Sequence, residues 1–95
     1  MKPVLNEMQD RMLAMADDEW MDLATAKSIF ESWFDVSISA AELGLILCKL
    51  LELQLISCTV KFQAVTAETL NVPDELSLVE FKSTGMGLRY LSGSL

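Results

Sequence analysis

The strongest constraint on the fold is one capped helix that leads almost directly into a strand. Ser39-Ala40-Ala41-Glu42 has the spacing of a capping box, in which the serine hydroxyl and the glutamate carboxylate each accept a backbone amide of the other. This pattern predicts a helix from Ala40 to about Leu53. Apolar and polar residues then alternate from Ile56 to Ala64, which is typical of a strand with one wet face. The sequence therefore predicts an α+β fold.

The rest of the chain contributes further elements on both sides of this unit. Helical spacing of apolar residues occurs twice before Ser39. The residues between those two stretches, Trp20 to Leu23, form either a short extended segment or the start of a helix that runs on to Trp33. Asn71-Val72-Pro73-Asp74 is typical of a turn or loop. The predicted order is a helix over 4–16, an extended piece over 20–23, a helix over 24–34, the capped helix, the strand, a loop over 66–77, a strand over 78–82 and a short helical turn over 88–91.

Length and composition indicate one folded domain without a membrane span. A chain of 95 residues is too short to close two hydrophobic cores, so we expect a single domain over residues 1–95, and a hydrophobic content of 52% excludes a disordered chain. The longest apolar run, 43–51, is interrupted by Lys49 and falls far short of the ~20 residues of a membrane span. No apolar signal core follows Met1. Cys48 and Cys58 form no C-x-x-C, and we expect two reduced thiols in a cytoplasmic protein, with a single disulfide between them as the alternative.

The order of elements resembles that of the winged helix-turn-helix family. Lys49-Leu50-Leu51-Glu52-Leu53-Gln54-Leu55-Ile56 resembles the third helix of that family running into its first wing strand, with Gln54 where the family often has a glycine. Thr84-x-x-Gly87-x-x-Tyr90-Leu91 resembles the closure after the last wing strand in many bacterial regulators. The resemblance covers about residues 5–91. It implies three helices followed by a two- or three-stranded β-hairpin wing and a short C-terminal helix. It also implies nucleic-acid binding, although the fold serves protein contacts as well.

Charge makes DNA a poor partner for such a domain. The chain has 7 Lys and Arg against 14 Asp and Glu, a net charge of −7. DNA affinity comes chiefly from Lys and Arg that neutralise phosphates. Residues 66–80, which include the wing loop, contain only acids among their charged residues. A nucleic-acid site would have to depend on Lys27, Lys49, Lys61 and Lys82.

The capped helix carries more apolar surface than a half-exposed helix needs. At about 100° per residue, Leu43, Leu47 and Leu50 centre one face, and apolar or small residues cover about two-thirds of the circumference. A stripe of about 100° would suffice. Either the first helix and the C-terminal segment cover this surface within the monomer, or another protein meets it, and a second copy is one such partner. The candidate interface residues are Ala41, Gly44, Leu45, Cys48 and Trp20.

No pattern in the chain indicates catalysis. The absence of histidine excludes histidine base catalysis and imidazole metal ligands. Asp17-Asp18-Glu19 lacks the spacing and the glycine of a calcium loop, and Gly85-Met86-Gly87 does not open a βαβ unit. We therefore expect no enzyme, no cofactor and no metal site.

These observations predict a small acidic winged-helix protein that acts through protein contacts, as a homodimer, an adaptor or a regulator of another protein. A DNA-binding transcriptional regulator is the first alternative. An acidic chaperone or DNA-mimicking inhibitor is the second.

Overall fold

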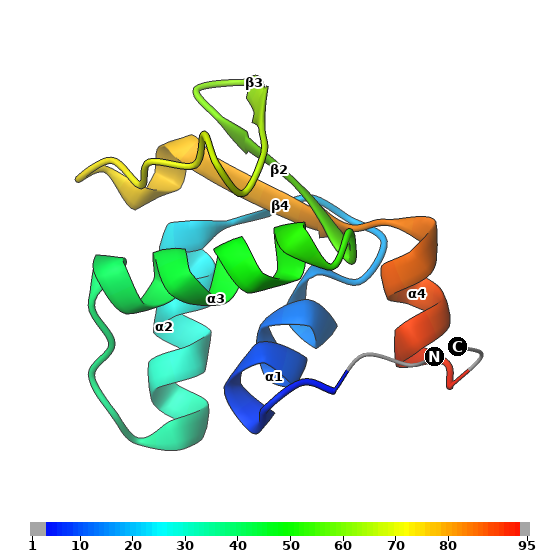
Figure 1. The fold of residues 1–95 in the computed structure, drawn as a ribbon. Helices are drawn as coiled ribbons and strands as arrows, with labels where there is room; N and C mark the ends of the chain where they lie inside the picture. The colour runs from blue at the N-terminus through cyan, green and yellow to red at the C-terminus, as the bar shows by residue number, and fades with distance from the viewer. Residues whose placement is uncertain (1–3, 94–95) are drawn as a thin grey trace.

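The computed structural model describes residues 4–93, and its elements follow the predicted order (Figure 1). Helices and strands form an α+β arrangement in which the described helices pack against a four-stranded antiparallel sheet. In chain order the elements are α1 (Glu7–Ala16), β1 (Met21–Asp22), α2 (Leu23–Phe34), α3 (Ala40–Glu52), β2 (Ile56–Val60), β3 (Gln63–Val65), the 3-10 turn η1 (Leu76–Leu78), β4 (Val79–Ser83) and α4 (Gly85–Leu91).

Each of these α-helices begins at a side chain that accepts a backbone amide three residues later. The predicted capping box is confirmed, because the Glu42 amide donates to Ser39 Oγ at 3.1 Å and the Ser39 amide donates to Glu42 Oε1 at 3.3 Å. Such caps satisfy amides that have no partner inside the helix, and they fix where each helix starts. The other caps and their donors are Asn6 with Gln9, Asp22 with Thr25, and Thr84 with Gly87.

The sheet settles one alternative and corrects one prediction. Residues 21–22 pair with β4 as strand β1, so the extended interpretation of this segment is confirmed. The alternating run from Ile56 to Ala64, however, is a hairpin and not one strand. Val60 pairs with Gln63 across a two-residue turn. The sheet therefore has four strands, in the order β1-β4-β2-β3, where a two- or three-stranded wing was expected.

The turn was missed because its residues are unusual for its geometry. Lys61 and Phe62 have φ values of 52° and 68°. A two-residue hairpin turn with both φ angles positive favours Asn-Gly or a similar pair. With Lys-Phe in those positions, the sequence shows only an unbroken alternation, and Phe62 is assigned to the buried face.

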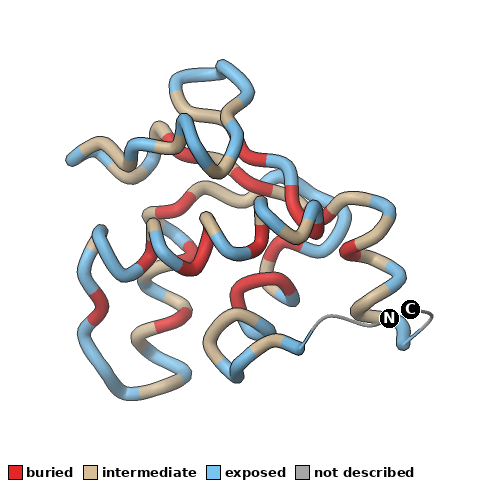
Figure 2. Tube along the Cα trace, in the orientation of Figure 1, coloured by how far each residue is buried: buried red, intermediate tan, exposed pale blue. Residues whose placement is uncertain are grey.

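The hydrophobic core lies where α3 meets the other helices and the sheet (Figures 1 and 2). The expected face of α3 is buried, since Leu43, Leu47 and Leu50 have no exposed surface and Ile46 has little. α3 contacts α1 on one side and β2 on the other. The remaining large core side chains, each fully or almost fully buried, include Met12, Leu13, Leu23, Phe30, Leu55, Val79 and Phe81.

The C-terminal closure depends on three residues singled out by the sequence. Gln54 has a φ of 60°, the left-handed conformation for which a glycine is the usual residue. Thr84 ties α4 to this point, because its hydroxyl donates to the Gln54 carbonyl at 2.7 Å and its amide donates to the Leu55 carbonyl at 3.0 Å. A Cβ at Gly87 would overlap the Leu55 carbonyl oxygen. Gly87 is therefore required by this close approach of two backbones.

Cys48 and Cys58 are both free thiols, as expected. Over residues 4–93, none of the helices combines the length and the apolar character that crossing a bilayer would require.

Candidate functional site

The solvent-exposed side of α3 is short of both basic and base-reading side chains. Its exposed residues are Ala41, Glu42, Leu45, Lys49 and Glu52. Leu45 is 71% exposed in the middle of the helix, where an exposed leucine gains nothing from the core. The opposite side of the same helix is buried (Figure 2). The face that α3 presents outward therefore consists of one large apolar side chain among two acids and one lysine.

A groove runs between α3 and the segment that joins β3 to β4. Its hollow measures about 400 Å³, and its lining side chains are apolar apart from one asparagine and one cysteine. We call it the α3 groove. Its α3 wall consists of Ala40, Ala41, Gly44, Leu45 and Cys48, and its second wall consists of Leu70, Asn71 and Val72. Four of the five residues expected at an interface thus line one groove.

The second wall partly covers the apolar face of α3 within the chain. A Cβ at Gly44 would lie 3.3 Å from Val72 Cγ2, so the small size of Gly44 admits the chain's own Val72. The Cys48 thiol, half-buried, donates to the Ala67 carbonyl at 3.1 Å. Internal cover was expected from the first helix or the C-terminal segment, and at these two positions the segment after β3 provides it instead. Leu45 remains open at the edge of the groove.

A second hollow continues along α3 toward its C-terminal end. It measures about 450 Å³ and is lined by Glu52 and Gln54 of the helix end and by Thr66, Ala67 and Glu68 among others. We call it the acidic hollow. Within the described part of the chain, Glu52 and Glu68 make no ion pair or side-chain hydrogen bond. Its two carboxylates are therefore available to an incoming cation.

Trp20 lies apart from the α3 groove. It borders a different hollow, of about 430 Å³, formed by residues 14–21. Its ring is 48% exposed, and the Lys82 Nζ lies 5.8 Å from the ring centroid. This cation–π contact gives the exposed face of Trp20 a partner from the same chain. The structure does not bring Trp20 together with the four residues of the α3 groove.

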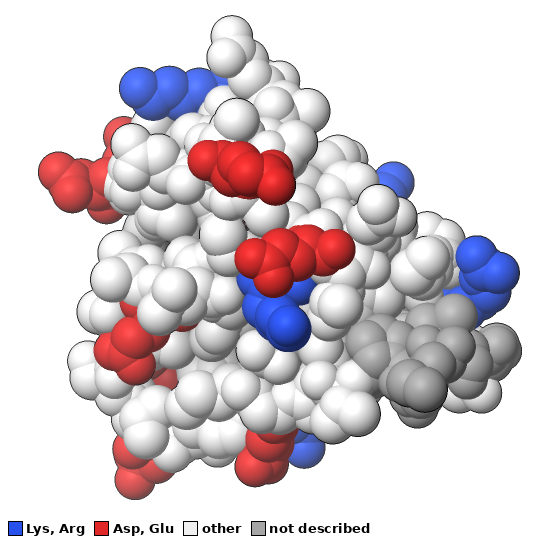
Figure 3. All heavy atoms as spheres, viewed as in Figure 1, with Lys and Arg blue, Asp and Glu red and all other residues white. Residues whose placement is uncertain are grey.

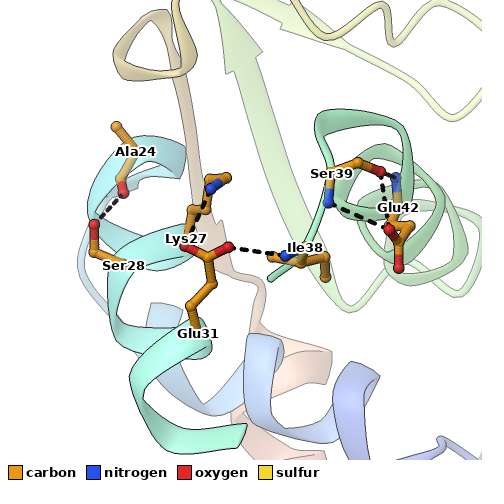
Figure 4. A network of polar contacts seen from close by, with 7 residues as sticks. All are labelled: Ala24, Lys27, Ser28, Glu31, Ile38, Ser39 and Glu42. Atoms are coloured by element: carbon orange, nitrogen blue, oxygen red, sulfur yellow. Dashed lines mark hydrogen bonds and ion pairs between the residues drawn. The ribbon is translucent and has the colours of Figure 1, made fainter. Parts of the chain in front are cut away.

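The four candidate lysines for nucleic-acid binding do not converge. Lys27 of α2 forms an ion pair with Glu31 at 3.1 Å (Figure 4), and Lys82 of β4 lies over Trp20. Lys49 of α3 and Lys61 of the β2–β3 turn are exposed. On the face shown in Figure 3, acidic and basic side chains are interspersed, and the basic ones do not merge into a patch.

Glu31 fixes the connection that leads into α3. Its carboxylate accepts the Ile38 amide at 2.8 Å in addition to the Lys27 ammonium (Figure 4). The Ile38 hydrogen bond, and after it the Lys27 contact, holds the pKa of Glu31 below its usual value. With the Ser39–Glu42 box next to it, this contact positions the start of α3 and hence the groove.

Several exposed or groove-lining residues were not predicted from the sequence. Leu70 and Val72 were assigned only to a loop, although two apolar side chains within a polar stretch were a signal of contact. Phe62 is 87% exposed at the tip of the β2–β3 hairpin, and no pattern distinguished it from an inward-facing strand residue. Trp33 is 54% exposed, with the Arg11 guanidinium 5.6 Å from its ring centroid.

Neither cysteine is placed for nucleophilic chemistry. Burial raises the pKa of the Cys58 thiol to about 11, which keeps it protonated at neutral pH. The hydrogen-bond partner of the Cys48 thiol is a backbone carbonyl. Across residues 4–93, no three Cys, Asp or Glu side chains gather as a metal site would require.

A scan against protein-family models and searches of curated proteins and of solved structures find no match for this chain. Its function is therefore inferred from the geometry of the chain itself.

Proposed function

We propose that this chain is a small acidic winged-helix protein that acts through protein contacts made by the exposed face of α3 and the α3 groove. The helix–strand–helix–helix–hairpin–strand–helix order and the antiparallel sheet support the winged-helix assignment. The partner is either a second copy of this chain or a different protein that this chain adapts or regulates.

The observation that carries this proposal is the exposure of Leu45 beside an apolar groove. Isolated exposed leucines are ordinary, but this one borders a hollow of about 400 Å³ whose walls are mostly apolar. Concave apolar surfaces of this size are typical binding sites. A partner side chain in the groove would bury Leu45, and with it the apolar surface that the fold leaves in water.

DNA binding is less well supported by the same geometry. In a helix-turn-helix reader, the recognition helix enters the major groove and contacts base edges with polar side chains. The exposed face of α3 instead offers Leu45 and the carboxylates of Glu42 and Glu52, with Lys49 as its one base. The helix has no Arg, Asn or Gln. The carboxylates on α3 would repel the DNA phosphates, and no basic patch converges there to offset this electrostatic repulsion.

Position-specific photo-crosslinking in the cells of origin tests the proposal. A benzophenone amino acid replaces Leu45 in one variant and Thr25, exposed on α2, in the matched control. We expect an adduct from position 45 that is larger than the chain and that nuclease leaves intact, and no such adduct from position 25. A nuclease-sensitive adduct from position 45 would favour the DNA reader, and equal adducts from both positions would remove the assignment of α3 as the contact face.

A further inference from the structure

We infer that the α3 groove and the acidic hollow together bind an amphipathic helix of a different protein, with its apolar side chains in the groove and a Lys or Arg in the hollow. This inference rests on the proposed function and adds the chemistry of the partner.

The two hollows lie in succession along one helix. Leu45 borders the apolar one and Glu52 borders the acidic one, and the two residues are seven positions apart. Seven residues are about two helical turns, or about 10 Å along the axis. A helix laid beside α3 presents side chains on one face at i, i+3, i+4 and i+7, so an apolar anchor and a basic residue two turns apart would reach both hollows.

Charge selects a different protein over a second copy. The exposed charged residues on α3 and on the segment after β3 are Glu42, Lys49, Glu52, Glu68, Asp74 and Glu75, and Lys49 is the one base among them. A two-fold dimer through the groove would place these acids of both copies at one boundary. Like charges at a boundary oppose association, and the net charge of −7 adds to this. A partner with basic residues beside its apolar face converts the same carboxylates into attractive contacts.

A designed peptide provides the probe. It is a fluorescein-labelled peptide of about 18 residues that forms a helix. Its leucines at i, i+3, i+4 and i+7 form one apolar face, and its lysines lie on the helix surface at both edges of that face. A second peptide has the same leucines and glutamates in place of the lysines. Fluorescence anisotropy with the full chain measures both affinities at low and at high salt, because screening weakens exposed charge contacts. We expect the lysine peptide to bind more tightly than the glutamate peptide and to lose affinity as salt rises.

Variants of the chain separate the apolar and the charged parts of the site. Leu45→Glu should weaken the lysine peptide about tenfold by removing the apolar anchor contact. The double variant Glu52→Lys/Glu68→Lys should weaken it about tenfold and should bind the glutamate peptide instead. The double variant Asp18→Lys/Glu19→Lys makes the same charge change at exposed carboxylates outside the two hollows and should change affinity less than about threefold. Circular dichroism and urea midpoints establish that each variant is folded.

Each contrary outcome points to a distinct error. No binding of either peptide, or equal effects of Asp18→Lys/Glu19→Lys and Glu52→Lys/Glu68→Lys, would overturn the inference. Tighter binding of the glutamate peptide to the wild type would overturn the basic partner while leaving a protein contact on α3 in place. A stable dimer of the chain that Leu45→Glu dissociates would make a second copy the occupant. Salt-sensitive binding of duplex DNA with no peptide binding would overturn the proposed function as well.

Discussion

Two glycines of α4 should respond to alanine in opposite directions. A Cβ at Gly87 would overlap the Leu55 carbonyl oxygen and would lie 3.1 Å from its carbonyl carbon and 3.3 Å from Leu13 Cδ1. The first two of these atoms belong to the backbone and cannot rotate away. α4 must therefore move outward from β2, or the start of β2 must shift.

The expected loss for Gly87→Ala follows from three contributions. Overpacking against backbone costs about 1–3 kcal/mol. Displacement of α4 also weakens the Thr84 amide–Leu55 carbonyl hydrogen bond, which contributes about 0.5–1.5 kcal/mol. The higher helix propensity of alanine returns up to about 1 kcal/mol. We expect a net loss of about 0.5–4.5 kcal/mol in the free energy of unfolding.

Gly85→Ala is the matched control on the same helix. No atom lies within 4 Å of a Cβ at this exposed position, so the variant should be as stable as the wild type or up to about 1 kcal/mol more stable. Urea unfolding followed by tryptophan fluorescence measures both variants. If Gly87→Ala is as stable as Gly85→Ala, the close approach of α4 to the Leu55 carbonyl is not a feature of the folded protein.

Three further predictions concern the cap, the connection into α3 and the thiols. Ser39→Ala should lower the free energy of unfolding by about 0.5–2 kcal/mol in urea titrations, and an unchanged value would place the start of α3 elsewhere. The hydrogen bond from the Ile38 amide lowers the pKa of Glu31 below its usual 4.5. This contact therefore stabilises the folded protein fully above about pH 4.5, and its contribution is lost as pH falls through the pKa of Glu31 in the folded state. The stability gap between wild type and Glu31→Gln should therefore shrink between about pH 7 and about pH 3, and a constant gap would contradict this. Burial keeps the pKa of Cys58 near 11, so a thiol reagent at about pH 8 should modify Cys48 in a fast phase and Cys58 in a slow phase. Loss of the fast phase in Cys58→Ala would contradict this order of reactivity.

The parts of the fold that local chemistry determines were predictable from sequence. Ser39 and Glu42 define the start of α3 because a capping box depends on residues only three apart. The buried face of α3 follows from the spacing of Leu43, Leu47 and Leu50, since the helical repeat places them on one side. For the segment before α2, the sequence did not decide between an extended conformation and a helix, because two strand residues are too few to show a periodic pattern. Its pairing with β4 makes it a strand.

The missed features depend on contacts between distant residues or on backbone strain. Val72 reaches Gly44 from 28 positions away, and no local pattern announces that contact. The turn at Lys61 and Phe62 adopts positive φ angles without the residues that usually favour them. Neither the hairpin nor the exposure of Phe62 could therefore be predicted from the sequence. For the candidate site, one wall was predictable from α3 alone, whereas the second wall and the acidic hollow required the path of the chain after β3.

We propose that the exposed face of α3 binds protein and not DNA. The most direct measurement is a pair of NMR titrations of the ¹⁵N-labelled chain, one with the leucine–lysine peptide and one with duplex DNA. We predict that the peptide shifts the amide signals of Gly44, Leu45, Cys48 and Glu52, and that the duplex leaves them in place. Shifts at Lys49 and Lys61 on addition of the duplex, with none along the α3 groove on addition of the peptide, would contradict the account.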